Sequence, residues 1–161
     1  SDFFAWAAES PSSPTSGDVG RFQAKIIRGI AIAKTGDLVF GAVVKPAAGP
    51  GSVVIDATTG SRSTTGGAVG MASPTPGRAS FNVTGEGGQA FSITVPASFQ
   101  MTGPQPMTVT TTNSAGPSPI LSGALGSQGA FAFGVGGSAP INAGTLSGDY
   151  TGSFTVTVAY N

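Results

Sequence analysis

The chain of 161 residues contains no histidine and no cysteine. Imidazole bases, thiol nucleophiles, disulfides and Cys/His metal sites are therefore all excluded. Two carboxylates could still meet in space, as in glycosidases, but the chain is poor in the polar and aromatic side chains that sugar-binding enzymes use. We predict no enzymatic activity, no cofactor and no metal site. The seven carboxylates are dispersed singly, with no two within four positions of each other: Asp2, Glu9, Asp18, Asp37, Asp56, Glu86 and Asp149.

Charge is also scarce, with seven basic and seven acidic residues and a net charge of zero. A chain of this kind lacks the basic face that nucleic-acid binding requires. No run of eighteen apolar residues exists, so the sequence predicts no transmembrane segment. A net charge near zero gives little colloidal repulsion, which is unfavourable for a dispersed enzyme but suits a subunit that assembles.

Glycine and proline are abundant, with 26 and 12 residues. Hydrophobic alternation recurs between these turn-forming residues, a pattern typical of an all-β sandwich or barrel with many short strands. The length fits one domain. Residues 1–20 are predicted to be an N-terminal extension that ends in a Ser/Pro/Gly linker, and residues 21–161 a single β-sandwich domain.

The last twelve residues carry the clearest strand pattern in the chain. Apolar or small residues at even positions alternate with mostly Ser and Thr at odd positions, which predicts one strand with one face on a core. At ~3.3 Å per residue this strand would span roughly 40 Å. The residues on its core face are Tyr150, Gly152, Phe154, Val156, Val158 and Tyr160.

A second strand is predicted over residues 21–34. Phe22, Ala24 and Ile26 share one face, and residues 26–33 are largely apolar on both sides, which predicts burial of both faces there. The N-terminal extension holds an aromatic cluster of Phe3, Phe4 and Trp6. These rings are expected either to fold back onto their own domain or to dock on a neighbouring copy.

Further strands are predicted over residues 52–56, 68–72, 78–84, 90–95, 107–113 and 130–135. Two glycine-rich stretches separate strand candidates. Residues 86–88 are predicted to close a hairpin between residues 78–84 and 90–95, and residues 136–137 are predicted to form a turn.

Two aspartates and one short motif could be read as binding or modification sites. Asp37 and Asp56 lie at strand ends, where an aspartate commonly bonds its own backbone, with a calcium ion as the alternative. The stretch Asn82-Val83-Thr84 matches the short acceptor pattern for N-glycosylation.

Several phrases of the sequence, taken in order, resemble a known family. These phrases are Leu38-Val39-Phe40-Gly41, Val54-Ile55-Asp56, Gly60-Ser61-Arg62-Ser63, Ala79-Ser80-Phe81-Asn82-Val83-Thr84-Gly85, residues 93–96, Phe133-Gly134-Val135-Gly136-Gly137 and residues 148–161. Over roughly residues 30–161 the chain resembles a family of exported bacterial domains of unknown function. That family is similar to subunits of archaic chaperone–usher fimbriae and to spore-coat-U-like proteins.

The resemblance implies an immunoglobulin-like, pilin-type sandwich that lacks its last strand and is completed by a donor strand from another copy. It implies a structural subunit of an extracellular, cell-surface filament, a head-to-tail homopolymer whose assembly could use a periplasmic chaperone and an outer-membrane usher. The expected donor segment is residues 19–28, with Phe22, Ala24 and Ile26 as the inserted side chains. The expected acceptor groove is lined by Phe154, Val156, Val158 and Tyr160, and the rings of Phe3, Phe4 and Trp6 are expected to pack between subunits.

The alternative is a self-contained adhesin or carbohydrate-binding sandwich, with ligand loops at residues 96–106 and 113–119. The two hypotheses differ in the partner of the N-terminal segment. A self-contained module would pair residues 21–33 with the final strand of its own chain.

Overall fold

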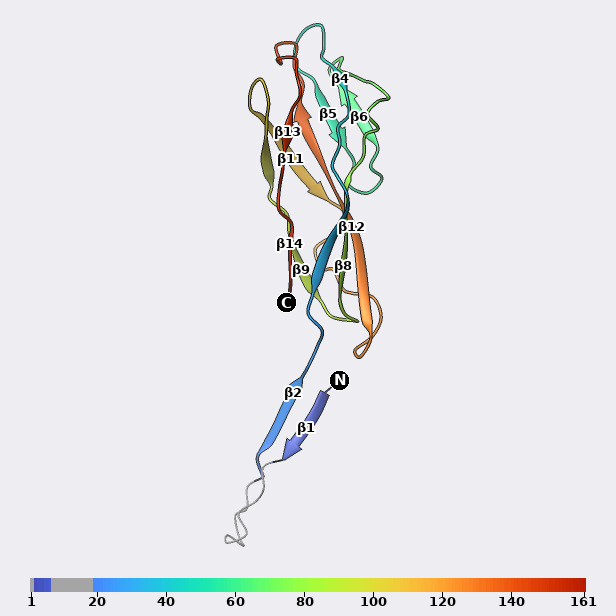
Figure 1. Cartoon of the computed structure of the whole chain (residues 1–161), viewed down its shortest axis with the longest axis vertical. Helices are drawn as coiled ribbons and strands as arrows, with labels where there is room; N and C mark the ends of the chain where they lie inside the picture. The colour runs from blue at the N-terminus through green and yellow to red at the C-terminus, as the bar shows by residue number, and fades with distance from the viewer. Residues whose placement is uncertain (1, 7–18) are drawn as a thin grey trace.

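The computed structural model describes residues 2–6 and 19–161, with only the backbone described for residues 2–6. This part of the chain is all β, which confirms the predicted fold class (Figure 1). Its strands are β1 (Asp2–Trp6), β2 (Arg21–Lys25), β3 (Ala31–Gly36), β4 (Val43–Val44), β5 (Ser52–Ile55), β6 (Arg62–Thr65), β7 (Val69–Gly70), β8 (Ala79–Glu86), β9 (Phe91–Thr94), β10 (Ser98–Thr102), β11 (Met107–Asn113), β12 (Gln128–Pro140), β13 (Thr151–Gly152) and β14 (Thr157–Tyr160). No described helix is long and apolar enough to cross a membrane.

The strands form a sandwich-like body that is elongated along one axis (Figure 1). The main sheet has the order β13-β10-β11-β12-β5-β6, and β8 joins it by pairing with both β12 and β3. Three two-stranded sheets complete the fold: β14-β9, β4-β7 and β1-β2. The β1-β2 hairpin extends below the body, and β4, β5 and β6 lie in the upper half.

The long strand β12 connects the two halves of the body. Its first half pairs with β8, and its second half pairs with β11 on one side and β5 on the other. The predicted turn at Gly136 and Gly137 is therefore wrong, because both residues lie inside β12. Gly136 is needed for close approach, since a Cβ atom there would clash with the backbone carbonyl oxygen of Ile55.

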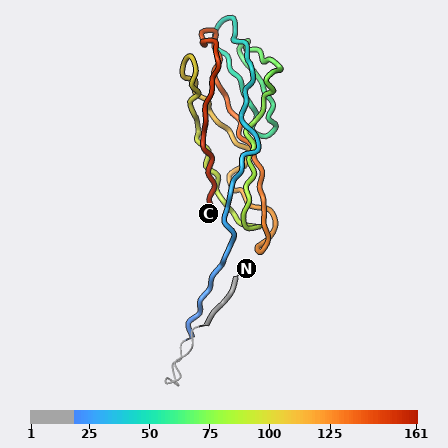
Figure 2. The backbone as a smooth tube through the Cα atoms, in the orientation of Figure 1, coloured from blue at the N-terminus to red at the C-terminus, as the bar shows by residue number. Residues whose placement is uncertain are grey.

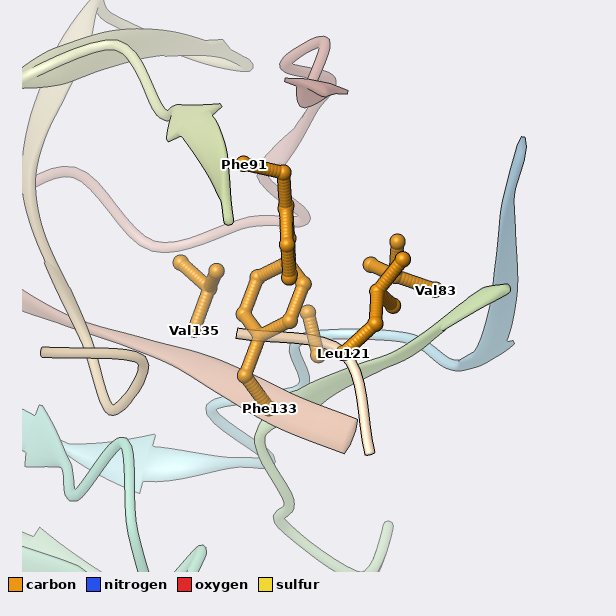
Figure 3. Close-up of a cluster of buried hydrophobic side chains, with 6 residues drawn as sticks. Val83, Phe91, Leu121, Phe133 and Val135 are labelled. Atoms are coloured by element: carbon orange, nitrogen blue, oxygen red, sulfur yellow. The ribbon is translucent and has the colours of Figure 1, made fainter. Parts of the chain in front are cut away.

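Two apolar clusters fill the body, one in each half. The lower cluster joins β8 and β12 to β9 across the sandwich (Figure 3). Its buried side chains are Ala79, Val83, Phe91, Leu121, Phe133 and Val135. The upper cluster joins β5, β11 and the end of β12, and its buried side chains are Val53, Met107, Val109 and Ala139. Phe133 and Val135 of the lower cluster lie in the strand predicted over residues 130–135, and both are buried.

The final stretch is not one continuous strand. It divides into β13, which pairs with β10, and β14, which pairs with β9, with residues 153–156 outside any strand. The alternation nevertheless holds across the break, since Phe154, Val156 and Val158 are half-buried while their neighbours are exposed. The break marks the point where the chain passes from the upper sheet to the β14-β9 pair.

The predicted continuous strand over residues 21–34 is also wrong, because β2 ends at Lys25 and β3 begins at Ala31. Ile26 is 67% exposed, so burial of both faces of residues 26–33 is wrong as well. Within the described ranges β2 pairs with β1 alone, and β3 pairs with β8. Neither strand pairs with β13 or β14 among the described residues.

The predicted hairpin at residues 86–88 is wrong too. β8 pairs with β3 and β12, whereas β9 pairs with β14. The glycines carry the chain from one layer of the sandwich to the other. Gly87 must be small there, because a Cβ atom would meet the backbone of Ala124.

Replacing Gly136 with alanine should destabilise the body by about 1–3 kcal/mol, because the methyl group must displace the β5 backbone. Chemical denaturation of the two proteins measures this difference. Gly144→Ala is the matched control, since nothing lies within 4 Å of a Cβ atom at that position. Equal stabilities of the two variants would contradict the proposed packing role of Gly136.

Candidate functional site

A long open groove of about 1200 Å³ runs along the upper half of the body. One flank is the segment of residues 37–45, which leads from β3 into β4, and the other is the segment of residues 145–154, which contains β13. The groove exceeds the ~300–1,000 Å³ of a usual small-molecule pocket. Its length and open side suit an extended ligand better than a compact one.

Each flank contains a short β segment, and among the described residues each segment pairs with one neighbour. On the first flank, Val39 exchanges backbone hydrogen bonds with Gly77, and β4 pairs with β7. On the second flank, β13 pairs with β10. Among the described residues, no backbone hydrogen bond joins one flank to the other across the groove. An extended chain in the groove could therefore bond to one or both edges.

The floor of the groove is apolar. Side chains from both clusters of the body reach it, several of them only half-buried. The rings of Phe99 and Phe154 pack against each other there, with centroids 5.0 Å apart. An occupant with apolar side chains at alternate positions would cover this floor. The principal apolar residues of the floor are Leu38, Phe40, Val43, Val53, Phe81, Phe99, Met101, Met107, Ile141, Tyr150 and Phe154.

We call the upper end of the groove, where residues 37–45 end and residues 145–154 begin, its mouth. Lys45 lies there on one flank and Thr145 on the other, joined by a hydrogen bond of 2.7 Å from the Lys45 Nζ to the Thr145 carbonyl oxygen. The chain rises along residues 37–45 towards this mouth and descends along residues 145–154 away from it (Figure 2). The two flanks thus run in opposite directions.

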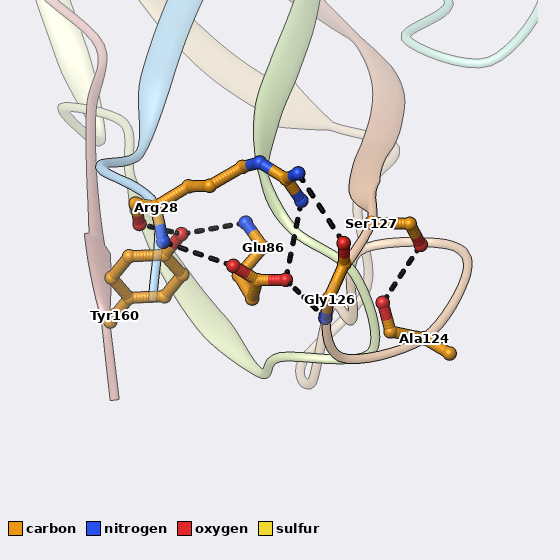
Figure 4. Close-up of polar contacts among 6 residues, drawn as sticks. All are labelled: Arg28, Glu86, Ala124, Gly126, Ser127 and Tyr160. Atoms are coloured by element: carbon orange, nitrogen blue, oxygen red, sulfur yellow. Dashed lines mark hydrogen bonds and ion pairs between the residues drawn. The ribbon is translucent and has the colours of Figure 1, made fainter. Parts of the chain in front are cut away.

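A second structured element fixes the base of the N-terminal arm, residues 19–27, at the bottom of the body. Both backbone groups of Arg28 are bonded to side chains of the body (Figure 4). Its N–H donates to Glu86 Oε1 at 3.1 Å, and its carbonyl oxygen accepts from the Tyr160 hydroxyl at 2.7 Å. The Arg28 guanidinium pairs with Glu86 Oε2 at 3.3 Å and also donates to the Gly126 carbonyl oxygen. We call this set of contacts the arm latch.

Glu86 is the centre of the arm latch. It is only 4% exposed and accepts hydrogen bonds from the backbone N–H groups of Arg28 and Gly126. These two bonds, and then the Arg28 charge, hold the pKa of the Glu86 carboxyl below its usual value, against the opposing effect of burial. Its backbone N–H in turn donates to the Tyr160 hydroxyl at 2.8 Å.

The expected donor side chains lie on the arm, outside the body. Phe22 is 62% and Ile26 67% exposed, while Ala24 is half-buried. Along one edge β2 is paired with β1, with Phe3 opposite Ala24 and Trp6 opposite Arg21. The side chains of Phe3, Phe4 and Trp6 lie outside the described part of the structure, so neither alternative for their packing is decided.

The expected acceptor residues separate into two groups. Phe154 lines the groove. Val156, Val158 and Tyr160 lie below it and pack against the lower cluster. Of the four expected acceptor residues, Phe154 is thus the one that lines the groove, and the Tyr160 hydroxyl belongs to the arm latch.

Asp37 and Asp56 both have partners within the protein. Asp37 pairs with Lys34 at 2.6 Å. Asp56 accepts from the backbone N–H groups of Thr59 and Thr58, each at 2.8 Å, which lowers the pKa of its carboxyl. Within the described residues, no group of three or more acidic side chains could hold a metal ion.

Sequence reasoning missed the flank of residues 37–45 and the arm latch. One signal was present, because Arg28 interrupts the apolar face of residues 22–32. A charged residue in such a position needs a partner, and Glu86 supplies it from a distant strand. No local pattern marks Glu86 itself, since it stands at the start of a glycine-rich turn.

The family model described as domain of unknown function DUF4402 matches residues 30–160, and the chain belongs to this family. The match begins two residues after Arg28, so the arm precedes the matched region. No curated protein and no solved structure was found to match the chain.

Tyr160→Phe should destabilise the protein by about 1–3 kcal/mol, because it leaves the part-buried Glu86 N–H without its acceptor. Tyr150→Phe is the matched control, since its hydroxyl makes an exposed bond to the Leu146 carbonyl oxygen only. Urea unfolding of the three proteins measures the difference. A Tyr150→Phe effect as large as that of Tyr160→Phe would contradict the role given to the arm latch.

Stability should also fall in acid. The pKa of Glu86 is lower in the folded state than its usual 4.5, so its stabilising contribution is complete above pH 4.5 and is lost as the pH falls through the folded value. The Glu86→Gln variant should be less stable than the parent chain at pH 7. This difference in stability should narrow towards pH 3. Melting temperatures across this range measure the effect. A gap that stays constant with pH would contradict it.

Proposed function

We propose that this member of the DUF4402 family is a structural subunit of an extracellular bacterial filament, joined head-to-tail by exchange of a donor strand. The observation that carries the proposal is the apolar groove, which lies between two flanks that share no backbone hydrogen bond. The chain carries a matching element outside its body, the exposed strand β2.

The pattern of β2 fits the groove in its side chains. Phe22 and Ala24 of β2, and Ile26 just after it, occupy alternate positions of the arm and would lie on the apolar floor. Burial of Phe22 and Ile26 at ~1.5–3 kcal/mol each gives roughly 3–6 kcal/mol. Backbone bonds to the groove edges, at ~1 kcal/mol net each, add to this before the ordering entropy is subtracted.

The arm and the groove also agree in length. The arm comprises residues 19–27, which span ~30 Å when extended. The flank of residues 37–45 has the same number of residues. Insertion would expose one edge of β2 to each flank, so the β1-β2 pairing would be exchanged for pairing with the groove.

Direction supports the same arrangement. β2 runs upward into its own body, whereas residues 145–154 run downward from the mouth (Figures 1 and 2). Translating one copy along the long axis places the arm of the upper copy antiparallel to residues 145–154 of the lower one. A joint made this way does not close on itself, so it produces a fibre.

The fold that this proposal implies is an immunoglobulin-like, pilin-type sandwich without its last strand. Its partners are other copies of the chain, together with a periplasmic chaperone and an outer-membrane usher if assembly follows the resemblance. The cell surface is the corresponding location. A structural subunit of this kind needs no catalytic centre and no cofactor.

A self-contained adhesin remains the second hypothesis, but no structural observation favours it. That hypothesis expected pairing of residues 21–33 with the final strand of the same chain. β2 and β3 pair with other strands instead.

The double variant Phe22→Ser/Ile26→Ser should abolish filaments while leaving a folded monomer, because both side chains are largely exposed in a single copy. Gln23→Ser/Lys25→Ser, on the opposite face of β2, is the matched control and should still polymerise. Negative-stain microscopy and size-exclusion chromatography give the readout, and circular dichroism checks folding.

Deletion of residues 1–28 should likewise leave no filaments. Filaments formed by the Phe22→Ser/Ile26→Ser variant, or by the chain that lacks residues 1–28, would contradict the proposal.

A further inference from the structure

The upper end of the body carries an exposed apolar patch beside the mouth of the groove. β4 and β7 pair with Val44 directly opposite Val69, so these two side chains lie on the same face of the ribbon. Met71 follows Val69 by two residues and, bonded to the Ala42 carbonyl oxygen, continues that face. All three side chains are at least half exposed, at 50%, 57% and 52%. We call Val44, Val69 and Met71 the upper patch.

The lower end of the body carries a second pair of exposed apolar side chains, Ile120 and Leu125, which we call the lower patch. Both lie in the connection between β11 and β12. Leu125 precedes Gly126, whose backbone is bonded to both Arg28 and Glu86 in the arm latch (Figure 4). Leu125 is therefore next to the point where the arm leaves the body.

The arm latch joins the arm directly to the body, without a flexible linker between them. The arm ends at Ile27, and both backbone groups of the next residue, Arg28, are bonded to the body. No free linker can separate the lower end of one copy from the groove that its arm would fill. The mouth of that groove, where Val44 lines one flank, is the upper end of the neighbouring copy.

We infer that the upper patch of one copy docks against the lower patch of the next copy. This inference rests on the proposed function, because the arm must occupy the groove for the two ends to meet. The occupant of the upper patch is thus a second copy of this chain, and the contact is continuous with the groove at Val44. The contact shields two apolar patches from water and limits bending at the joint.

Cross-linking tests the contact directly, because the chain has no cysteine of its own. The double variant Val69→Cys/Leu125→Cys, assembled and treated with a short bis-maleimide, should give a ladder of covalent multimers on a denaturing gel. Each single variant should give no multimers above the background of the parent chain. A mixture of the two single variants should stop at dimers, since each copy then has one reactive end.

Thr110→Cys/Leu125→Cys is the matched control. Thr110 is an exposed strand residue in the middle of β11, away from both ends of the body, and should give no ladder. Negative-stain images of every variant before cross-linking show whether filaments have formed.

The outcomes separate this inference from the proposed function. Filaments with a Val69/Leu125 ladder and no Thr110/Leu125 ladder support the docking of the two patches. Filaments without the Val69/Leu125 ladder, or with equal ladders from both pairs, overturn the docking and leave donor-strand exchange standing. Absence of filaments in the parent chain overturns both proposals.

Discussion

Two described backbone segments that share no backbone hydrogen bond with each other are the constraint on which the rest of the structure depends. Residues 37–45 are bonded outward to β7 and Gly77, and residues 145–154 are bonded outward to β10. Between them the side chains of both apolar clusters remain partly open. An added strand in this place would extend the hydrogen bonding and cover the apolar side chains. The groove thus lacks backbone hydrogen-bond partners as well as apolar cover.

The arm latch is the second fixed point, and it explains why the arm projects from the body. Glu86 is a nearly buried carboxylate, which is stable only because two backbone N–H groups and the Arg28 guanidinium surround it. The same contacts hold the backbone of Arg28. The exposed apolar face of β2 then lies beyond the body, where its own core does not cover it.

The sequence predicted the local features well and the long-range ones poorly. Strict alternation predicted β11 over residues 107–113 with the bounds that the structure has. The same alternation could not show that residues 150–161 divide between two sheets, because the buried face keeps its phase across the break. Glycine patterns were misread for a related reason. Gly136 permits close approach of β5, and only the packed structure shows that neighbour.

Of the predicted acceptor residues, one lines the groove and one belongs to the arm latch. Phe154 lines the groove, whereas Tyr160 serves the arm latch, and no sequence pattern distinguishes these two aromatic residues of one strand face. Their roles depend on where the chain crosses between sheets. That crossing is fixed by contacts with β9 and β10, which are far away in the sequence.

The direction of the chain explains why the arm should enter the groove of another copy rather than its own groove. From Arg28 the arm would have to turn back upward to reach its own groove, and it would then run parallel to the descending residues 145–154. It would also have to break both backbone bonds of Arg28 to the arm latch. An arm from the copy above needs neither change, because it arrives antiparallel to residues 145–154 with its latch intact. The latch that fixes one copy's arm thus favours the groove of the next.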